Sequence, residues 1–262
     1  DICNRTYFDA IVQPESQKDE IGALVEMLRR NEFGRKTIIL CDRGYEGYWP
    51  LGVMIERPNV DFVLRVKQNH SAMREIARLP MCELDCSISF SLTTTQTNED
   101  KRLRRIHISV PKKSKPGSKT KRSRWDLPSP YTMRLRIVRF QLDTGVFETL
   151  ATSLPPSFTI DDLKALYGMR WGIETSFRDL QHTVGLVHLH GKSDPFVEQE
   201  VYAALTAFNY ASRVTREVVI RQPKDGVYAY RVNFKNAVTM AKEQNRNPAL
   251  DHAVRVREMA KH

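Results

Sequence analysis

The sequence predicts an α/β protein that contains one β-rich stretch. Residues 6–67 alternate between strand and helix patterns in the order β-α-β-α-β, which is typical of an α/β core. Residues 71–153 instead hold segments in which apolar and polar residues alternate, which is typical of antiparallel strands with one exposed face. From residue 159 onwards, apolar residues recur at helical spacing.

The first part of the chain is predicted to form three strands and two helices. The run at 36–41 is continuously apolar and suits a strand that is covered on both faces. Pro14 ends the predicted strand Thr6–Gln13, because proline donates no hydrogen bond to a sheet. In chain order the elements are strand Thr6–Gln13, helix Lys18–Arg30, strand Lys36–Cys41, helix Gly47–Arg57 and strand Asp61–Lys67.

The β-rich stretch is predicted to form four strands with one exposed face each. Asp143, Thr144 and Gly145 lie between the last two strands and suit a hairpin loop. The predicted strands are Ser87–Thr93, Leu103–Val110, Tyr131–Leu142 and Val146–Leu154.

The pattern over Thr159–Leu186 predicts an amphipathic helix. Thr159 and Asp162 resemble a capping box at its start. A polar strip borders its apolar stripe, made of Tyr167, Arg170, Glu174 and Gln181. Periodicity alone also fits an ordinary amphipathic helix with a solvated Arg170–Glu174 pair.

Two further helices are predicted towards the C-terminus. Asp194 and Pro195 suit the N-cap and first position of a long helix. Asn233 suits the N-cap of a last helix that runs to about Lys242.

Composition narrows the class of partner. The net charge of +10 and the pI near 9.5 favour a polyanion, nucleic acid before membrane, although a basic protein without such a role also fits. No apolar run is long enough to predict a membrane span. The four cysteines form no paired metal or disulfide motif, and we expect reduced thiols in a cytosolic protein.

The segment Lys101–Arg124 is rich in Lys and Arg and has no acidic residue. Its second half also contains Pro116, Gly117 and several serines, a composition that favours an interaction loop. A solvated loop without a dedicated partner is the other interpretation. We favour contacts with DNA phosphates through Lys112, Lys113, Lys115, Lys119, Lys121, Arg122 and Arg124.

Asp42 directly follows the apolar run at 36–41, in the sequence Asp42-Arg43-Gly44-Tyr45. Open α/β sheets place their chemistry at the carboxyl ends of such strands. An aspartate in an ordinary strand-to-loop turn would give the same local pattern. The sequence therefore makes Asp42 a candidate for catalysis.

Two motifs together resemble transposases of the DDE class, in the group typified by insertion sequence four. Tyr167, Arg170 and Glu174 match the Y-x2-R-x3-E part of its Y-x2-R-x3-E-x6-K signature, and Asp42-Arg43-Gly44-Tyr45 matches its second aspartate motif. The lysine of the signature falls on Gln181, which can hydrogen-bond but carries no charge.

The resemblance implies an RNase H-like mixed sheet with flanking helices, interrupted by an antiparallel β-rich insertion. It implies residues 1–70 as the first part of the core, 71–154 as the insertion with its basic loop, 155–220 as the catalytic helix and the rest of the core, and 221–262 as a helical tail. It also implies that the strand at 61–67 lies at the edge of the sheet.

The resemblance further implies how such a protein works. Asp42 and Glu174 would be catalytic carboxylates that hold two Mg²⁺ or Mn²⁺ ions, since these ions prefer oxygen ligands. The substrate would be double-stranded DNA, at the transposon ends and at the target, bound by a homodimer in the bacterial cytoplasm at the nucleoid. Contacts to DNA are implied for Tyr167, Arg170, Gln181, Arg43 and Arg178.

The family has a third carboxylate, on a strand upstream of both motifs, for which the sequence offers no match. Asp9 lies in a predicted strand, but the resemblance aligns that strand with a later one. We therefore expect an N-terminally truncated fragment that lacks the first catalytic aspartate. Two other functions stay open, a metal-dependent nuclease on the same core and an inactive DNA-binding remnant.

Overall fold

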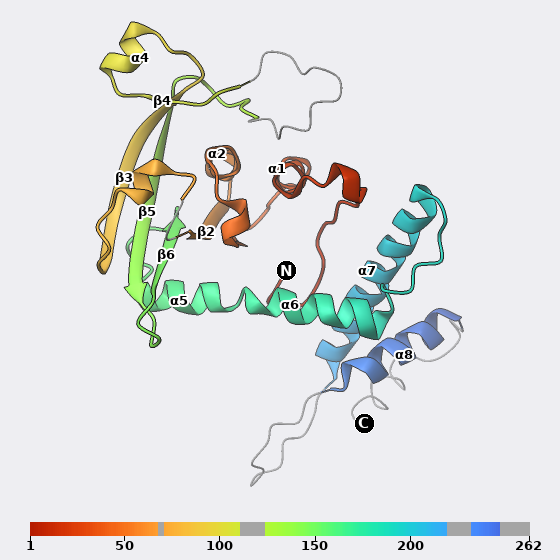
Figure 1. Ribbon diagram of the computed structural model, residues 1–262. Helices are drawn as coiled ribbons and strands as arrows, with labels where there is room; N and C mark the ends of the chain where they lie inside the picture. The colour runs from red at the N-terminus through yellow and green to blue at the C-terminus, as the bar shows by residue number, and fades with distance from the viewer. Residues whose placement is uncertain (68–70, 111–123, 219–231, 247–262) are drawn as a thin grey trace. The chain divides into compact units, whose positions relative to one another are not determined.

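The computed structural model describes residues 1–67, 71–110, 124–218 and 232–246 (Figure 1). By its internal contacts the chain separates into two compact units. We call residues 19–168 the sheet unit, and residues 1–18 with 169–262 the helical unit. The predicted boundaries at residues 70, 154 and 220 stay a prediction, because compactness in space does not show which segment of a chain is an insertion.

The described part of the sheet unit is built on one six-stranded mixed sheet in the order β1-β2-β6-β5-β3-β4. The pairs β1–β2 and β3–β4 are parallel and the others are antiparallel. This arrangement confirms the predicted α/β class and is consistent with an RNase H-like fold. The strands are β1 (Thr37–Cys41), β2 (Val60–Val66), β3 (Leu84–Thr93), β4 (Ile106–His107), β5 (Tyr131–Gln141) and β6 (Phe147–Thr152).

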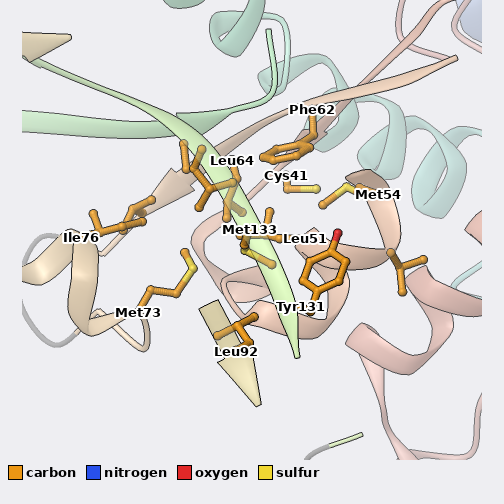
Figure 2. Close-up of a cluster of buried hydrophobic side chains, with 14 of the residues drawn as sticks. Cys41, Leu51, Met54, Phe62, Leu64, Met73, Ile76, Leu92, Tyr131 and Met133 are labelled. Carbon is orange, nitrogen blue, oxygen red and sulfur yellow. The ribbon is translucent and has the colours of Figure 1, made fainter. Parts of the chain in front are cut away.

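Successive residues of a strand point to opposite faces of a sheet, and both faces of this one are covered. Phe62 and Leu64 of β2 belong to a large apolar cluster with helices α1 (Glu20–Arg30) and α2 (Tyr48–Glu56). Figure 2 shows part of this cluster, in which side chains from the sheet meet those of α2. Val63, between them, belongs to a second cluster with helix α5 (Ile160–Gly168).

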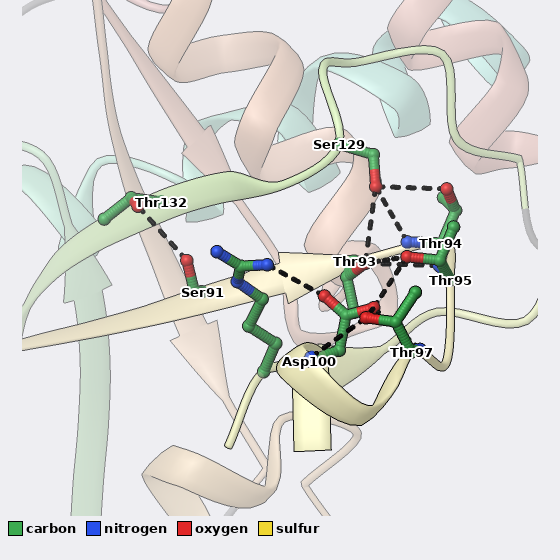
Figure 3. Close-up of polar contacts among 9 residues, drawn as sticks. Ser91, Thr93, Thr94, Thr95, Thr97, Asp100, Ser129 and Thr132 are labelled. Carbon is green, nitrogen blue, oxygen red and sulfur yellow. Dashed lines mark hydrogen bonds and ion pairs between the residues drawn. The ribbon is translucent and has the colours of Figure 1, made fainter. Parts of the chain in front are cut away.

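Short helical segments connect the strands of the sheet unit. They are η2 (Arg43–Tyr45) after β1, α3 (Arg74–Ala77) after β2 and α4 (Asn98–Arg102) after β3. Asp100 of α4 is buried and accepts hydrogen bonds from Thr95 and Thr97, which closes a polar network around the end of β3 (Figure 3).

The helical unit packs its helices around Phe208, which is fully buried. Among the described residues, no helix has the length and hydropathy of a membrane-spanning segment. The helical unit contains η1 (Glu15–Gln17), α6 (Trp171–Arg178), η3 (Asp179–Val184), α7 (Asp194–Glu217) and α8 (Phe234–Arg246).

Most local predictions are confirmed. The capping box forms, since the Thr159 amide donates to Asp162 at 2.8 Å and the Asp162 amide donates to the Thr159 hydroxyl at 3.1 Å. The β5–β6 hairpin turns at Gly145, whose φ is 80°. The Asn233 side chain accepts from the Lys235 amide at 3.0 Å and so caps α8. The four cysteines are free thiols.

The predicted strand Thr6–Gln13 is wrong, because this segment lies along the helical unit without strand structure. The Asn209 side chain of α7 accepts from the Tyr7 amide at 2.7 Å and donates to the Tyr7 carbonyl at 2.8 Å. The Tyr7 ring packs edge-on against Phe208. A distant side chain therefore satisfies the Tyr7 backbone groups that a sheet would otherwise pair.

Two predictions about strands are also corrected. The strand at 61–67 was implied to lie at the edge, but β2 lies between β1 and β6 and pairs with both. The predicted strand Leu103–Val110 shortens to Ile106–His107, because the residues before it form the end of α4 and a turn with Arg104 at a φ of 51°.

The predicted helix Thr159–Leu186 is broken into α5, α6 and η3. After Gly168 the backbone tightens, with bonds from Gly172 to Met169 at 2.9 Å and from Ile173 to Arg170 at 3.0 Å. An interior glycine favours such a break, because it costs about 1 kcal/mol in a helix relative to alanine. Phe177, an apolar residue of this stretch, is 48% exposed.

Candidate active site

Asp42 lies where the chain leaves β1, the first strand of the sheet. Cys41, the last residue of β1, pairs with Leu64 of the parallel strand β2, so both strands end at the same edge of the sheet. The Asp42 carboxylate caps η2 by accepting from the Arg43 amide at 2.6 Å. Among the described residues, no ion pair to Asp42 is formed.

Cys41 is not a competing ligand beside Asp42. Burial raises the pKa of its thiol to about 12, and the negative charge of Asp42 adds to that shift. At neutral pH the thiol keeps its proton, whereas a metal ligand or nucleophile would be a thiolate. The oxygen chemistry of this strand end therefore comes from the carboxylate.

Glu174 lies in the first turn of α6, where the positive end of the helix dipole favours a negative charge. Its side chain is half exposed, and Arg170 donates to its Oε1 from Nη2 at 3.1 Å. The Arg170 guanidinium also lies 4.9 Å from the centre of the Trp171 ring. The predicted Arg170–Glu174 pair is thus present, with the carboxylate facing solvent.

The other predicted contacts of this stretch have different surroundings. Tyr167 is buried in the apolar cluster beneath α5, with Leu163 and Val63, so its ring packs inside the sheet unit. Arg178 and Gln181 are exposed on α6 and η3 of the helical unit, and Arg43 is exposed beside Asp42 in the sheet unit. The structure thus groups Arg170, Glu174, Arg178 and Gln181 in one unit, and Asp42, Arg43 and Tyr167 in the other.

Most of the predicted basic loop lies outside the described residues, namely Lys112, Lys113, Lys115, Lys119, Lys121 and Arg122. Arg124 is described, and its guanidinium is 3.0 Å from the Asp19 carboxylate and 5.7 Å from the centre of the Trp49 ring. Arg124 therefore has an intramolecular partner, which a DNA phosphate would have to replace.

Sequence reasoning missed Glu46, a second carboxylate near Asp42. Its side chain is buried and accepts from the Lys67 amide at 2.9 Å and the Ala72 amide at 2.8 Å. The Asp-Arg-Gly-Tyr motif ends one residue before it, and Glu is rarely buried unless it is hydrogen-bonded. Glu46 lies two residues before the apolar helix α2, and this position by itself does not indicate burial.

A metal site requires several side chains that can donate oxygen, nitrogen or sulfur ligands. Among residues 1–67, 71–110, 124–218 and 232–246, no three His, Cys, Asp or Glu side chains gather as metal ligands. Asp42 and Glu174 do offer the carboxylate oxygens that Mg²⁺ and Mn²⁺ prefer. Each carboxylate is thus of a donor type that suits a divalent ion; Asp42 belongs to the sheet unit and Glu174 to the helical unit.

Comparison with protein families gives a match over residues 9–210 to the transposase DDE domain. A comparison with curated proteins gives no match. The matched region covers more than half of the chain and includes both Asp42 at the end of β1 and Glu174 on α6. Transposases of this family act on DNA and generally use divalent metal ions. The chain belongs to the transposase DDE domain family.

Proposed function

We propose that this chain acts in the cutting and joining of transposon DNA ends, with Asp42 and Glu174 as two of the catalytic carboxylates. The observation that carries the proposal is the family match, which spans both motifs in the expected order. The position of Asp42 supports it, because the residue follows a strand that is apolar on both faces, at the carboxyl end of a parallel pair.

Divalent ions, two of Mg²⁺ or Mn²⁺ in this proposal, would supply polarisation of the scissile phosphate and activation of the attacking oxygen. The role of Asp42 and Glu174 is to hold them with carboxylate oxygens. Arg170, which pairs with Glu174 at 3.1 Å, would hold a phosphate oxygen beside that carboxylate. The third carboxylate that the resemblance implies would come from a strand upstream of Asp42.

In this proposal, the basic side chains provide the affinity for DNA. Arg43, Arg178 and the basic loop would contact phosphates, while Gln181 replaces a charged contact with a hydrogen bond. Tyr167 is buried, so its contribution would include holding α5 against the sheet. We further propose that a homodimer does this work on nucleoid DNA in the bacterial cytoplasm.

The test is Mg²⁺-dependent cleavage and joining of a labelled duplex that carries the element's ends. The chain is compared with the same chain extended upstream in its reading frame. We expect cutting and strand transfer by the extended protein, and a loss of about 1000-fold or more in Asp42→Asn and Glu174→Gln, because each removes a metal ligand. Asp143→Asn, in the exposed β5–β6 turn, is the matched control and should cut normally.

Other outcomes have definite meanings. Cutting without strand transfer would favour a nuclease on this core. Salt-sensitive DNA binding without any metal-dependent step, in both proteins, would contradict the proposal and favour a DNA-binding remnant. Cutting by the unextended chain that depends on Asp42 would place the third carboxylate within it, and Asp9 would be the first residue to substitute.

A further inference from the structure

Glu46 is a carboxylate residue four positions after Asp42. It is buried, with only 7% of its surface exposed. Its Oε2 accepts from the Lys67 amide at 2.9 Å. Its Oε1 accepts from the Ala72 amide at 2.8 Å and the Met73 amide at 3.4 Å, and from the Ser71 hydroxyl. Each carboxylate oxygen therefore binds a different part of the following segment.

These bonds join the two loops that leave the parallel strands. Glu46 belongs to the connection between β1 and α2, which begins at Asp42. Lys67 directly follows β2, and Ser71 to Met73 lead into α3. Because β1 and β2 are parallel and in register at Cys41 and Leu64, both loops start at the same edge of the sheet. Glu46 therefore links the two loops by hydrogen bonds.

Moving a carboxylate from water into the protein interior costs free energy, so an ionised group is stable there only if it is well hydrogen-bonded. The described partners of Glu46 are backbone amides and a hydroxyl, and none of them is a cation. A buried polar group whose hydrogen bonds are satisfied restricts the position of the chain that carries it. The loop that is fixed is the one that carries Asp42.

We propose that Glu46 is a positioning residue, which holds the backbone of Asp42 to Tyr45 so that the Asp42 carboxylate keeps one orientation. The proposal rests on the proposed function for Asp42. Glu46 itself is buried and would touch neither DNA nor an ion. It acts through the short segment η2, whose first residue Arg43 also donates its amide to Asp42.

The test uses Glu46→Gln, with Asp100→Asn as a matched control. Both residues are buried carboxylates that accept several hydrogen bonds in the sheet unit, but Asp100 lies by β3 and β4 at the opposite end of the strand order from β1. Glutamine keeps the size of glutamate and replaces one acceptor oxygen with a donor, so an amide or hydroxyl partner loses its acceptor.

The first readout is hydrogen exchange of backbone amides in the unextended chain. We expect Glu46→Gln to speed exchange about tenfold at 43–46 and at 71–73, which corresponds to a loss of about 1.4 kcal/mol of local stability. Asp100→Asn should leave both segments unchanged. Faster exchange at 71–73 alone would overturn the proposal, since Glu46 would then only hold the segment before α3.

The second readout is steady-state cleavage by the upstream-extended protein. Misplacement of a catalytic group lowers turnover, so we expect kcat to fall about tenfold to 100-fold in Glu46→Gln while the KM for DNA stays within about twofold. An equal loss in Asp100→Asn would overturn the positioning role. If the unsubstituted protein does not cut DNA, the proposed function fails, and the exchange experiment still decides whether Glu46 fixes the loop of Asp42.

Discussion

Asp100 illustrates, at the scale of one residue, how a buried charge is made stable. Its carboxylate accepts from the Thr95 hydroxyl at 2.7 Å and the Thr97 hydroxyl at 2.8 Å (Figure 3). It also accepts from the Arg105 guanidinium at 2.9 Å. Of these donors, Arg105 lowers the pKa of the Asp100 carboxyl most, and the threonine bonds lower it further. The ionised form is therefore favoured in the folded protein.

Stability should consequently depend on pH through Asp100. A lowered folded-state pKa contributes stability above the ordinary value of about 4, and that stability is lost as pH falls through the folded-state pKa. In urea unfolding, the parent protein should lose stability below about pH 4, and Asp100→Asn should lose less over the same range. Asp143→Asn, which changes an exposed carboxylate, serves as the control. Parallel curves for the parent protein and Asp100→Asn would contradict this assignment.

Arg136 is the second residue whose role depends on several directed bonds. Its guanidinium binds both oxygens of Asp85, at 2.6 and 2.8 Å, and donates to the carbonyls of Pro155 and Phe158 at 2.8 and 2.9 Å. It thereby ties β5 to the connection that leads into α5. The planar fork makes this possible, because lysine offers one point charge and cannot reach four acceptors in this geometry.

At the scale of elements, local signals were readable in the sequence and distant ones were not. The Thr159–Asp162 capping box and the Asn233 cap involve residues at most three apart, so their pattern predicted their structure. Thr6–Gln13 has the pattern of a strand, but Asn209 supplies partners for Tyr7 from 202 residues away. The sequence of the segment alone could not predict a hydrogen-bond partner so far along the chain.

The same distinction explains the strand order. The residues of β2 predicted a strand. Its internal position in the sheet, however, depends on pairing with β6, which lies far along the chain. At the site, the strand before Asp42 and the pairing of Arg170 with Glu174 were both predictable from spacing. The burial of Glu46 was not, because its partners at 67–73 are fixed only by the tertiary fold.

The attachment of the N-terminal segment to α7 is testable through Asn209. Asn209→Ala removes both bonds to the Tyr7 backbone and should destabilise the attachment by about 1 kcal/mol, since two partly buried backbone groups lose their partners. Hydrogen exchange at residues 6–10 should become faster. Thr206→Ala, on an exposed part of the same helix, is the control, and equal exchange in both variants would disprove the role of Asn209.

Gly185 ends η3 with a φ of 101°, and the amide of Leu186 then bonds back to the Leu180 carbonyl at 3.2 Å. A side chain is strained in this conformation, so Gly185→Ala should lower the free energy of unfolding by about 1–2 kcal/mol. Gly168→Ala is the matched control, because an added Cβ meets no atom within 4 Å there and should be neutral or stabilising. Urea unfolding measures both, and a neutral Gly185→Ala would show that the ending tolerates another geometry.

At the scale of the whole molecule, charge is the property that composition alone could predict. The net charge of +10 is concentrated partly in Lys101–Arg124, and the described ends of that segment use some of it internally. Arg105 pairs with Asp100 and Arg124 pairs with Asp19. The lysines between them have no acidic neighbour in the sequence, so they are the stronger candidates for phosphate contacts.

Spacing along the chain predicts contacts within one helix but not contacts between distant segments. Arg170 and Glu174 are four residues apart on a helical path, and their contact follows from that path. Asp42 and Glu174 belong to different compact units, and the number of residues between them does not determine a distance in space. Whether cutting needs both carboxylates is decided by the cleavage experiment with Asp42→Asn and Glu174→Gln.

The basic loop is tested by the salt dependence of DNA binding. Each phosphate contact contributes about −0.9 to the slope of log Kobs against log salt, so Lys112→Gln with Lys113→Gln should make the slope shallower by up to about 2. The binding of unrelated duplexes should weaken equally, because phosphate contacts carry no sequence information. Fluorescence anisotropy of a labelled duplex over a range of salt concentrations measures both effects.

The matched control for the loop is Lys36→Gln with Lys164→Gln, which removes the same charge from exposed positions elsewhere in the sheet unit. If only net charge matters, both pairs will change the slope alike, and the loop has no particular role. If the loop contacts DNA, the first pair will change the slope more than the second pair does, because counterions are released where a basic side chain contacts a phosphate. Since Glu174→Gln removes no positive charge, it should leave the slope unchanged, which separates binding from cutting in the same protein.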